Sequence, residues 1–383
     1  MNPSVNTEER QPRTIRLRTV LIISFILMLL TALAVAGAMS MAFLIGKNAT
    51  PSIEQQRQTV VQEGEVIEEI AQKVGRSVVS IVTERQSTGV FGSGPQGGAG
   101  TGVILDDKGL IITNRHVVPQ GTSRVRVVAY DGTVYDSVRL VGRDPLNDLA
   151  ILKVNNPKNF VPATLGDSDK VRTGQKVIAI GNALGQFQNT VTSGIISGMG
   201  RPVTAGDSTG ANVEQLSNLF QTDAAINSGN SGGPLLDFNG AVIGINTAVA
   251  ADAQNIGFAI PINEAKVIIE SAKETGKVSR PYLGVRYVAL TPALAQQLEI
   301  EQTQGAYISD ERGAIVSGGP ADKAGIRQRD IITKIGTIEL DSRNSLTSAI
   351  SRHKVGDTVN ITIIRGGQAR TISVELAEAP SNN

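Results

Sequence analysis

The sequence predicts a mainly β protein with an apolar helix near its N-terminus and a smaller α+β domain at its C-terminal end. Short apolar runs separated by turn signals recur between residues 77 and 260 without long alternating helices, which is typical of a β-barrel or a β-sandwich. The composition agrees, because 41 of 383 residues are glycine and only 3% are aromatic. This length suggests two or three domains.

The N-terminal helix is predicted from the 28 residues between Arg18 and Lys47, none of which is charged. Roughly 20 apolar residues cross a bilayer as a helix. Four arginines precede the run, so the positive-inside rule places residues 1–18 in the cytoplasm, a transmembrane helix at 19–46 and everything later outside. A cleaved signal peptide is the alternative, because Ala34-Val35-Ala36 fits a cleavage site. The apolar run continues past that site, which favours a retained anchor, and both interpretations export the protein.

A polar, glutamine-rich segment at residues 47–64 is predicted to be a linker. The helical spacing of Val66, Ile67, Ile70 and Val74 then predicts a short amphipathic helix that opens a domain at residues 65–275.

The strands of this domain are predicted from β-branched apolar runs. They lie at Ser77–Val82, Thr101–Leu105, Leu110–Thr113, Val125–Tyr130, Lys176–Ile180, Val191–Ile196, Ala241–Asn246 and Ile256–Ile260. The glycine-rich segment Gly92–Gly102 lacks the Lys-Ser/Thr ending of a phosphate-binding loop, so we expect a flexible surface loop there.

A second domain is predicted at residues 280–379, a comfortable length for a small domain. It combines three strand-like runs with two helical patterns. The strands are expected at Gly284–Val288, Val359–Ile364 and Thr371–Leu376, and the helices at Ala321–Ile326 and Ser345–His353.

Composition excludes several kinds of site. The chain has no cysteine, so disulfides, thiolate metal sites and cysteine nucleophiles are excluded. His116 and His353 are the only histidines, which excludes a histidine-rich metal centre. We expect no cofactor and no metal, and a net charge of +1 makes nucleic acid a poor candidate partner.

The strongest local signal for chemistry is Asn227-Ser228-Gly229-Asn230-Ser231-Gly232-Gly233-Pro234. Glycines let a backbone approach a substrate closely, and successive N–H groups can converge on one point. Ser231 is therefore a candidate nucleophile. The N–H groups of Gly229 and Ser231, with Asn230 between them in the same turn, would form an oxyanion hole. A plain surface turn is the alternative.

Two upstream residues could complete a hydrolase. His116 is the only histidine of the predicted β domain, so it is a candidate general base. Asp148 precedes an apolar strand and suits a residue that orients a histidine, but composition alone does not separate it from Asp144. The chain order His, Asp, Ser is that of two-barrel serine proteases and not that of α/β-hydrolases or subtilisins.

Several segments resemble signatures of the HtrA/Deg family of serine proteases. They are Thr113–Val117, Asp148–Lys153, Thr222–Asn227, Gly229–Pro234 and Gly257–Pro261, and the resemblance covers about residues 65–379. It implies two six-stranded antiparallel β-barrels of the chymotrypsin or trypsin type, followed by an α+β PDZ domain. The single PDZ domain and the N-terminal anchor look most like the membrane-tethered members that sense stress in the cell envelope.

The resemblance also implies roles for individual residues. Asp148 rather than Asp144 would be the triad carboxylate with His116 and Ser231. Ala225 would lie at the base of a small apolar substrate pocket beside Ile226, so cleavage after Val, Ala or similar residues is expected. The segment Tyr282-Leu283-Gly284-Val285 matches the PDZ loop that binds a terminal carboxylate.

From the resemblance we expect an ATP-independent endopeptidase in the form of a homotrimer. It would act on unfolded or misfolded polypeptides of the cell envelope, and its PDZ domain would bind C-terminal peptides for docking or activation. A peptide-binding or chaperone module with a dormant protease is the alternative. The sequence departs from the family at Thr101, where serine is more common, and at Arg329-Asp330, where a Gly-Asp turn is usual.

Overall fold

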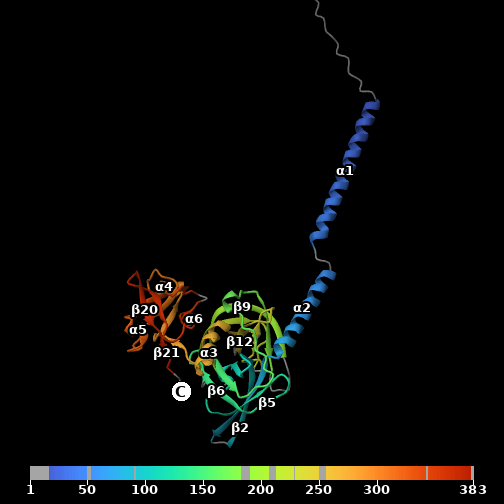
Figure 1. Cartoon of the computed structure of the whole chain (residues 1–383). Coiled ribbons are helices and arrows are strands. Elements are labelled where there is room, and N and C mark those ends of the chain that lie inside the picture. The colour runs from blue at the N-terminus through green and yellow to red at the C-terminus, as the bar shows by residue number, and fades with distance from the viewer. Residues whose placement is uncertain are drawn as a thin grey trace, which may run out of the picture. The chain divides into compact units, whose positions relative to one another are not determined.

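The computed structural model describes residues 17–49, 53–89, 92–182, 190–206, 213–227, 229–249, 256–341 and 344–380. The chain divides into two compact units, residues 1–65 and 66–383. The first unit carries the long helix α1 (Leu17–Ala49; Figure 1). Its segment Arg18–Met41 has a mean hydropathy of 2.7, and its side chains are exposed to solvent. By length and composition this segment is a candidate membrane span, where the sequence predicts one.

Helix α2 (Ile53–Gly75) is longer than the short helix that the sequence predicts. It covers residues 53–64 of the segment for which the sequence predicts a linker, so this part of the segment is helical. The physical reason is that glutamine and glutamate, which make the segment polar, are good helix formers. The C-terminal end of the helix packs against the core through Ile70 and Val74, both buried.

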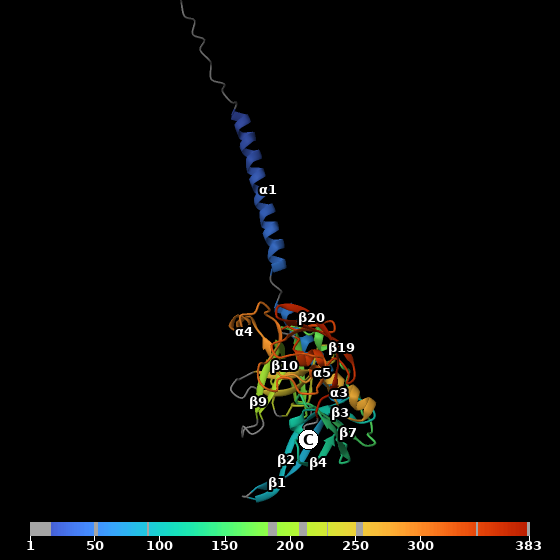
Figure 2. The same cartoon turned by 90° about the vertical axis from the view of Figure 1, so that its left-hand side faces the viewer.

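The first barrel is a seven-stranded sheet in the order β5-β4-β1-β2-β3-β7-β6, one strand more than expected. Gly92–Gly102 is not a loop, as its composition suggests, but part of a strand. Antiparallel pairing of β1 with β2 continues as far as Gly89 and Gly92, so this segment finds backbone partners. Figure 2 shows the resulting hairpin extending beyond the rest of the barrel. The strands are β1 (Val78–Gly89), β2 (Gly92–Ile104), β3 (Leu110–Thr113), β4 (Thr122–Val128), β5 (Val134–Tyr135), β6 (Val138–Arg143) and β7 (Ala150–Val154).

The second barrel is closed by six strands in the order β10-β13-β12-β11-β8-β9. Val177 and Leu235 belong to the cluster inside this barrel, whereas the alternating side chains of Ile178 and Leu236 face the other way and share one buried cluster with Val103 and Ile112 of the first barrel. The two barrels therefore pack as one body. The strands are β8 (Lys176–Gly181), β9 (Thr190–Gly206), β10 (Val213–Thr222), β11 (Pro234–Leu236), β12 (Val242–Val249) and β13 (Gly257–Pro261), and two 3₁₀ turns, η1 (Arg115–Val117) and η2 (Ser168–Lys170), lie in the connections.

Helix α3 (Ile262–Thr275) follows the second barrel and leads to the C-terminal α+β domain. The main sheet of this domain runs β15-β16-β17-β19-β20, and β14 pairs separately with β21. Its elements are β14 (Pro281–Tyr282), β15 (Tyr287–Leu290), α4 (Pro292–Gln297), β16 (Gly305–Ile308), α5 (Pro320–Lys323), β17 (Ile331–Ile335), β18 (Ile338–Glu339), α6 (Leu346–Ile350), β19 (Thr358–Arg365), β20 (Gln368–Glu375) and β21 (Ala377–Glu378). The mainly β fold class with a C-terminal α+β domain is thus confirmed.

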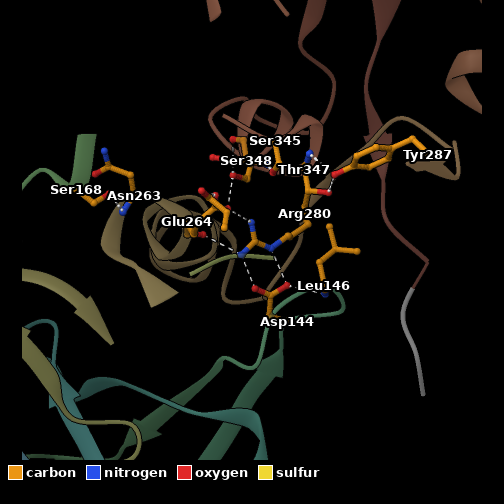
Figure 3. Close-up of polar contacts among 12 residues, drawn as sticks. Asp144, Leu146, Ser168, Asn263, Glu264, Arg280, Tyr287, Ser345, Thr347 and Ser348 are labelled. Carbon is orange, nitrogen blue, oxygen red and sulfur yellow. Dashed lines mark hydrogen bonds and ion pairs between the residues drawn. The ribbon is translucent and has the colours of Figure 1, made fainter. Parts of the chain in front are cut away.

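A buried ionic network joins this domain to the barrels (Figure 3). The guanidinium of Arg280 donates from Nε and Nη2 to the carboxylate of Asp144, at 2.7 and 2.5 Å, and from Nη2 to the backbone carbonyl of Glu264 at 2.8 Å. The Glu264 carboxylate in turn accepts hydrogen bonds from Ser351 Oγ, just after α6, and from Asn218 Nδ2 on β10. Burial alone would lower the pKa of Arg280, but the charges of Asp144 and Glu264 and the hydrogen bonds to Asp144 raise it.

Candidate active site

His116 lies in η1, directly after β3 of the first barrel. Its Nδ1 is 2.6 Å from Asp148 Oδ2, and its backbone N–H donates to Asp148 Oδ1 at 2.9 Å. The imidazole is 48% exposed, whereas the aspartate side chain is only 3% exposed. A buried carboxylate therefore holds Nδ1 of a ring that still faces solvent, which is the arrangement required of a general base.

The structure separates the two candidate aspartates. Asp148 contacts His116, while Asp144 is fully buried against Arg280. Asp148 is held on two further sides. Asn114 Nδ2 donates to its backbone carbonyl at 2.9 Å, and Thr247 Oγ1 donates to its Oδ2 at 2.7 Å.

Thr247 is a site residue that the sequence argument missed. It lies on β12 in the second barrel, and its carbonyl oxygen is 3.2 Å from Ser231 Oγ. Thr247 thus contacts both Asp148 and Ser231, and so brings the candidate nucleophile and the candidate carboxylate to the same place. In the sequence a threonine at this position is indistinguishable from any strand-forming β-branched residue.

Ser231 lies in a turn in which most peptide groups form hydrogen bonds. The N–H of Asn230 donates to the carbonyl of Asn227 at 3.0 Å, and the N–H of Gly233 donates to the carbonyl of Asn230 at 2.9 Å. Gly232 needs its left-handed φ of +83°, and a Cβ there would come within 2.1 Å of the Thr101 carbonyl oxygen. This glycine is therefore required for the turn to pack against the first barrel.

The N–H groups of Gly229 and Ser231 donate no hydrogen bond within the described part of the chain, while the N–H of Asn230 is engaged with Asn227. Gly229 and Ser231 are thus the two donors of this turn that remain available to an anion. Ser228, which supplies the peptide carbonyl before Gly229, lies outside the described residues.

The two candidate pocket residues have different environments. Ala225 is exposed, and its carbonyl oxygen accepts hydrogen bonds from Asn230 Nδ2 at 2.9 Å and from Thr192 Oγ1 at 3.0 Å. Ile226 is 3% exposed and packs in the core of the second barrel. Ala225 is therefore tied to the serine turn through the Asn230 side chain, whereas the Ile226 side chain lies inside the second barrel.

The candidate carboxylate loop is a second group of free N–H donors. Gly284 has a φ of +82°, a left-handed conformation that glycine adopts without penalty. The carbonyls of Leu283 and Gly284 accept hydrogen bonds from Ala321 and Val316, but within the described residues the N–H groups of Leu283, Gly284 and Val285 donate none. Tyr282 pairs with β21. Consecutive unpaired N–H groups around a left-handed residue form an anion-binding nest.

The strand beside this loop begins later than Gly284–Val288 would place it. The left-handed turn at Gly284 delays the ladder, so β15 starts at Tyr287 and pairs with β16 on one side only. No strand pairs with its other edge in the part of the chain that the structure describes. Tyr287 Oη lies 3.0 Å from Thr347 Oγ1, so the strand and the N-terminal end of α6 face each other across this edge (Figure 3).

The Arg329-Asp330 turn keeps a left-handed residue where glycine is usual. Arg329 has a φ of +67° and pairs with Asp310, while buried Asp330 binds Arg365. Elsewhere, no group of three or more His, Asp or Glu side chains suited to a metal ion occurs within the ranges that the structure describes.

Comparison with known proteins places this geometry in a family. Residues 100–245 match the model of the trypsin-like peptidase domain, and residues 281–376 match that of the PDZ domain. The serine protease Do-like HtrA of Bacillus subtilis is 38% identical over 338 residues, which cover 82% of this chain and 73% of the relative. The periplasmic serine endoprotease DegP of Salmonella typhimurium is 40% identical over 284 residues, but these span only 57% of its length.

A solved structure of the HtrA-type protease AlgW with a decapeptide is also similar. Its TM-score is 0.61 at 33% identity, and the match covers 82% of this chain and 99% of AlgW. Sequence, fold and site geometry agree on one assignment. The chain belongs to the HtrA/Deg family of serine proteases, with a trypsin-like peptidase domain and a single PDZ domain.

Proposed function

We propose that this protein is a serine endopeptidase of the cell envelope in which Ser231, His116 and Asp148 form the catalytic triad. One observation carries the proposal: a buried carboxylate binds Nδ1 of a solvent-facing histidine, and Thr247 joins that carboxylate to the serine turn. The peptidase-domain match and the names of the relatives support the same chemistry.

The residues divide the reaction as follows. Ser231 Oγ attacks the scissile carbonyl carbon while His116 takes its proton, and Asp148 stabilises the resulting imidazolium. The negative charge on the carbonyl oxygen is bound by the N–H groups of Gly229 and Ser231. His116 then gives its proton to the leaving amine as the C–N bond breaks. A water molecule then gives a proton to His116 and attacks the acyl carbon. The bond from this carbon to Ser231 Oγ breaks, and His116 returns the proton to the serine.

Specificity follows from the pocket beside the turn. Ala225 is small and uncharged, and the Ile226 side chain behind it is aliphatic. Neither side chain offers a partner for a basic side chain, so we propose cleavage after small apolar residues such as Val or Ala. Unfolded polypeptides expose these residues, and they are the proposed substrates.

The PDZ domain is proposed to bind the C-terminus of another polypeptide. The free N–H groups of Leu283, Gly284 and Val285 would hold the terminal carboxylate. The peptide would then add as a strand to the open edge of β15. The AlgW structure contains a decapeptide, which supports peptide binding by this type of protein.

Membrane attachment is proposed through α1, with the protease and PDZ domains on the extracytoplasmic side. The support is the candidate span at Arg18–Met41, the arginines before it and the periplasmic location in the names of relatives. A homotrimer is proposed from the family resemblance alone, and light scattering of the detergent-solubilised protein tests it directly.

The central test compares the full-length protein in detergent with its Ser231→Ala variant on unfolded casein. Casein cleavage by the wild type and none by the variant is expected. Equal cleavage by both would exclude the triad assignment. Adding a peptide with an apolar C-terminus is expected to raise the wild-type rate, and a rate that does not respond would leave the PDZ domain as a docking site only. A wild type that binds peptide but cleaves nothing would favour the dormant-protease alternative.

A further inference from the structure

Thr101 of β2 is buried, lies in the first barrel and contacts the serine turn of the second barrel. From its contacts we propose that Thr101 is a positioning residue. It would hold the peptide units on either side of Asn230 and Ser231, so that the nucleophile and its oxyanion donor keep their catalytic orientation. The proposal rests on the assignment of Ser231 as the nucleophile.

The side-chain hydroxyl of Thr101 makes two hydrogen bonds to backbone. It donates to the carbonyl oxygen of Gly229 at 2.7 Å and accepts from the N–H of Asn182 at 2.9 Å. The backbone N–H of Thr101 also donates to the carbonyl oxygen of Ser231 at 2.9 Å. One buried residue thus holds carbonyl groups on both sides of Asn230.

These contacts decide the orientation of whole peptide units, because the C=O of one residue and the N–H of the next lie in one plane. The unit between Gly229 and Asn230 is held at its oxygen by Thr101 and at its N–H by Asn227. The unit between Ser231 and Gly232 is held at its oxygen by Thr101 and at its N–H by Asn246, at 2.8 Å.

The unit between these two carries the N–H of Ser231, which donates to nothing within the described residues. Its direction is set by the two clamped neighbours and by the hydrogen bond from Gly233 to its carbonyl. Glycine at position 229 offers little resistance to rotation of its own. The Gly229 carbonyl therefore needs an external partner, and the Thr101 hydroxyl is that partner.

The structure also explains a threonine where the family more often has serine. A Cβ placed on Gly233 would come within 2.9 Å of the Thr101 Cγ2 methyl, so the methyl fills the space against this glycine. A β-branched side chain is stiff at χ1. The hydroxyl is thus directed at Gly229 in advance, whereas a serine hydroxyl would have to be ordered.

The test uses full-length protein in detergent and the variants Thr101→Val, Thr101→Ser and Thr101→Ala. The main readout is the second-order rate constant for labelling of Ser231 by a fluorophosphonate, which needs both nucleophile and oxyanion donors. For Thr101→Val we expect a fall of about 10- to 100-fold, the effect of a small misplacement of reacting groups. Because the Thr101 hydroxyl forms its hydrogen bonds with the backbone of Gly229 and Asn182, the midpoint of the pH–rate profile should not move.

Thr101→Ser restores the hydroxyl, so its labelling rate should stay within about threefold of the wild type, the loss reflecting extra rotamers. The matched control is Ser80→Ala. Ser80 is equally buried, and its hydroxyl donates to the carbonyl of Asn182 at 2.6 Å instead of to a carbonyl of the serine turn. Its thermal midpoint should fall while its labelling rate stays within about threefold, because only stability loses a hydrogen bond.

Labelling of Thr101→Val at the wild-type rate would overturn the positioning role alone, and so would an equal loss of labelling in Ser80→Ala. Labelling of Ser231→Ala would overturn the nucleophile assignment and this proposal with it. If Thr101→Val does not fold, Thr101→Ala serves as the test variant, because it also leaves the Gly229 carbonyl without its donor from Thr101. Its labelling rate must then fall at least about fivefold, since a loosely bound water replaces the hydroxyl only in part.

Discussion

Replacing Arg280 by methionine tests the ionic network that joins the PDZ domain to the barrels. Methionine keeps most of the side-chain length and removes the charge and all the donors. The change takes away both hydrogen bonds to Asp144 and the one to the Glu264 carbonyl (Figure 3). Asp144 is then a fully buried carboxylate, and among the described residues the only donor left to its oxygens is the backbone N–H of Leu146.

The size of the effect follows from this burial. Removing one partner of a buried ion pair typically costs about 3–5 kcal/mol, because the other charge is left uncompensated. A protein loses about 1–3 kcal/mol of stability per molar urea, with large domains at the upper end. The urea midpoint of Arg280→Met should therefore fall by about 1–2 M.

The double variant Arg280→Met with Asp144→Asn distinguishes the cost of losing the ion pair from the cost of leaving the Asp144 carboxylate buried without a partner. Asparagine keeps an acceptor for Leu146 and is neutral, so most of the stability should return, as expected when both members of a buried pair are removed. Unfolding of the full-length protein in detergent is followed by intrinsic tyrosine fluorescence and by circular dichroism.

Arg329→Met is the matched control. Its partner Asp310 is exposed, and the arginine side chain is itself 76% exposed. Removing this pair should leave the midpoint unchanged within error. The reasoning fails if Arg280→Met unfolds at the wild-type midpoint, or if the double variant is as unstable as the sum of the two single variants.

Three further outcomes are expected. In Gly284→Ala the alanine must hold a φ of +82°, which costs a non-glycine residue about 1–2 kcal/mol. Peptide affinity, measured by fluorescence anisotropy, should therefore fall about tenfold, while the cleavage rate of a short substrate is unchanged. Thr247→Val removes a donor from Asp148 and should lower kcat on a short peptide about tenfold with KM unchanged. Burial lowers the pKa of His353 below 6.5 despite the opposing charge of Asp357, so the unfolded state binds the proton more readily. Stability should therefore decline as pH falls through about 6.5. In His353→Gln the urea midpoint of unfolding should change less between about pH 7 and 5.5 than it does in the wild type.

The sequence was most informative where a local apolar run decides the structure. The run Leu110–Thr113 coincides with β3, and Lys176–Ile180 differs from β8 by one residue. Strand ends were harder to predict, because pairing across the sheet sets them. β9 continues past Ile196 to Gly206 because β10 pairs with it that far, and no apolar signal marks this extension.

Helix α3 was missed for a related reason. It begins after Pro261 without a side-chain cap, and its first turn buries Glu264, which a sequence reader places on a surface. The glutamate is buried because Ser351 and Asn218, distant in the chain, supply its hydrogen bonds. Tertiary contacts of this kind leave no local pattern.

In the candidate site, residue type and chain order were enough to name His116 and Ser231 as candidates before any coordinates, whereas the choice of Asp148 over Asp144 needed the family resemblance. The supporting residues were not found in this way. The side chains of Asn114, Thr101 and Thr247 form hydrogen bonds to partners 34, 128 and 99 positions away in the chain, respectively. Such contacts depend on how two barrels pack, and a threonine in a strand carries no sign of them.

Each barrel holds a candidate catalytic residue of the other through these supporting residues. Thr101 belongs to the first barrel and clamps the turn of Ser231, which precedes a strand of the second. Thr247 belongs to the second barrel and binds Asp148, which precedes a strand of the first. A small sliding of one barrel against the other would therefore loosen the carboxylate and the nucleophile together. In the proposed triad, the alignment of Ser231 with Asp148 thus depends on the packing between the barrels, and the Thr101 hydroxyl would act at that junction without contacting substrate.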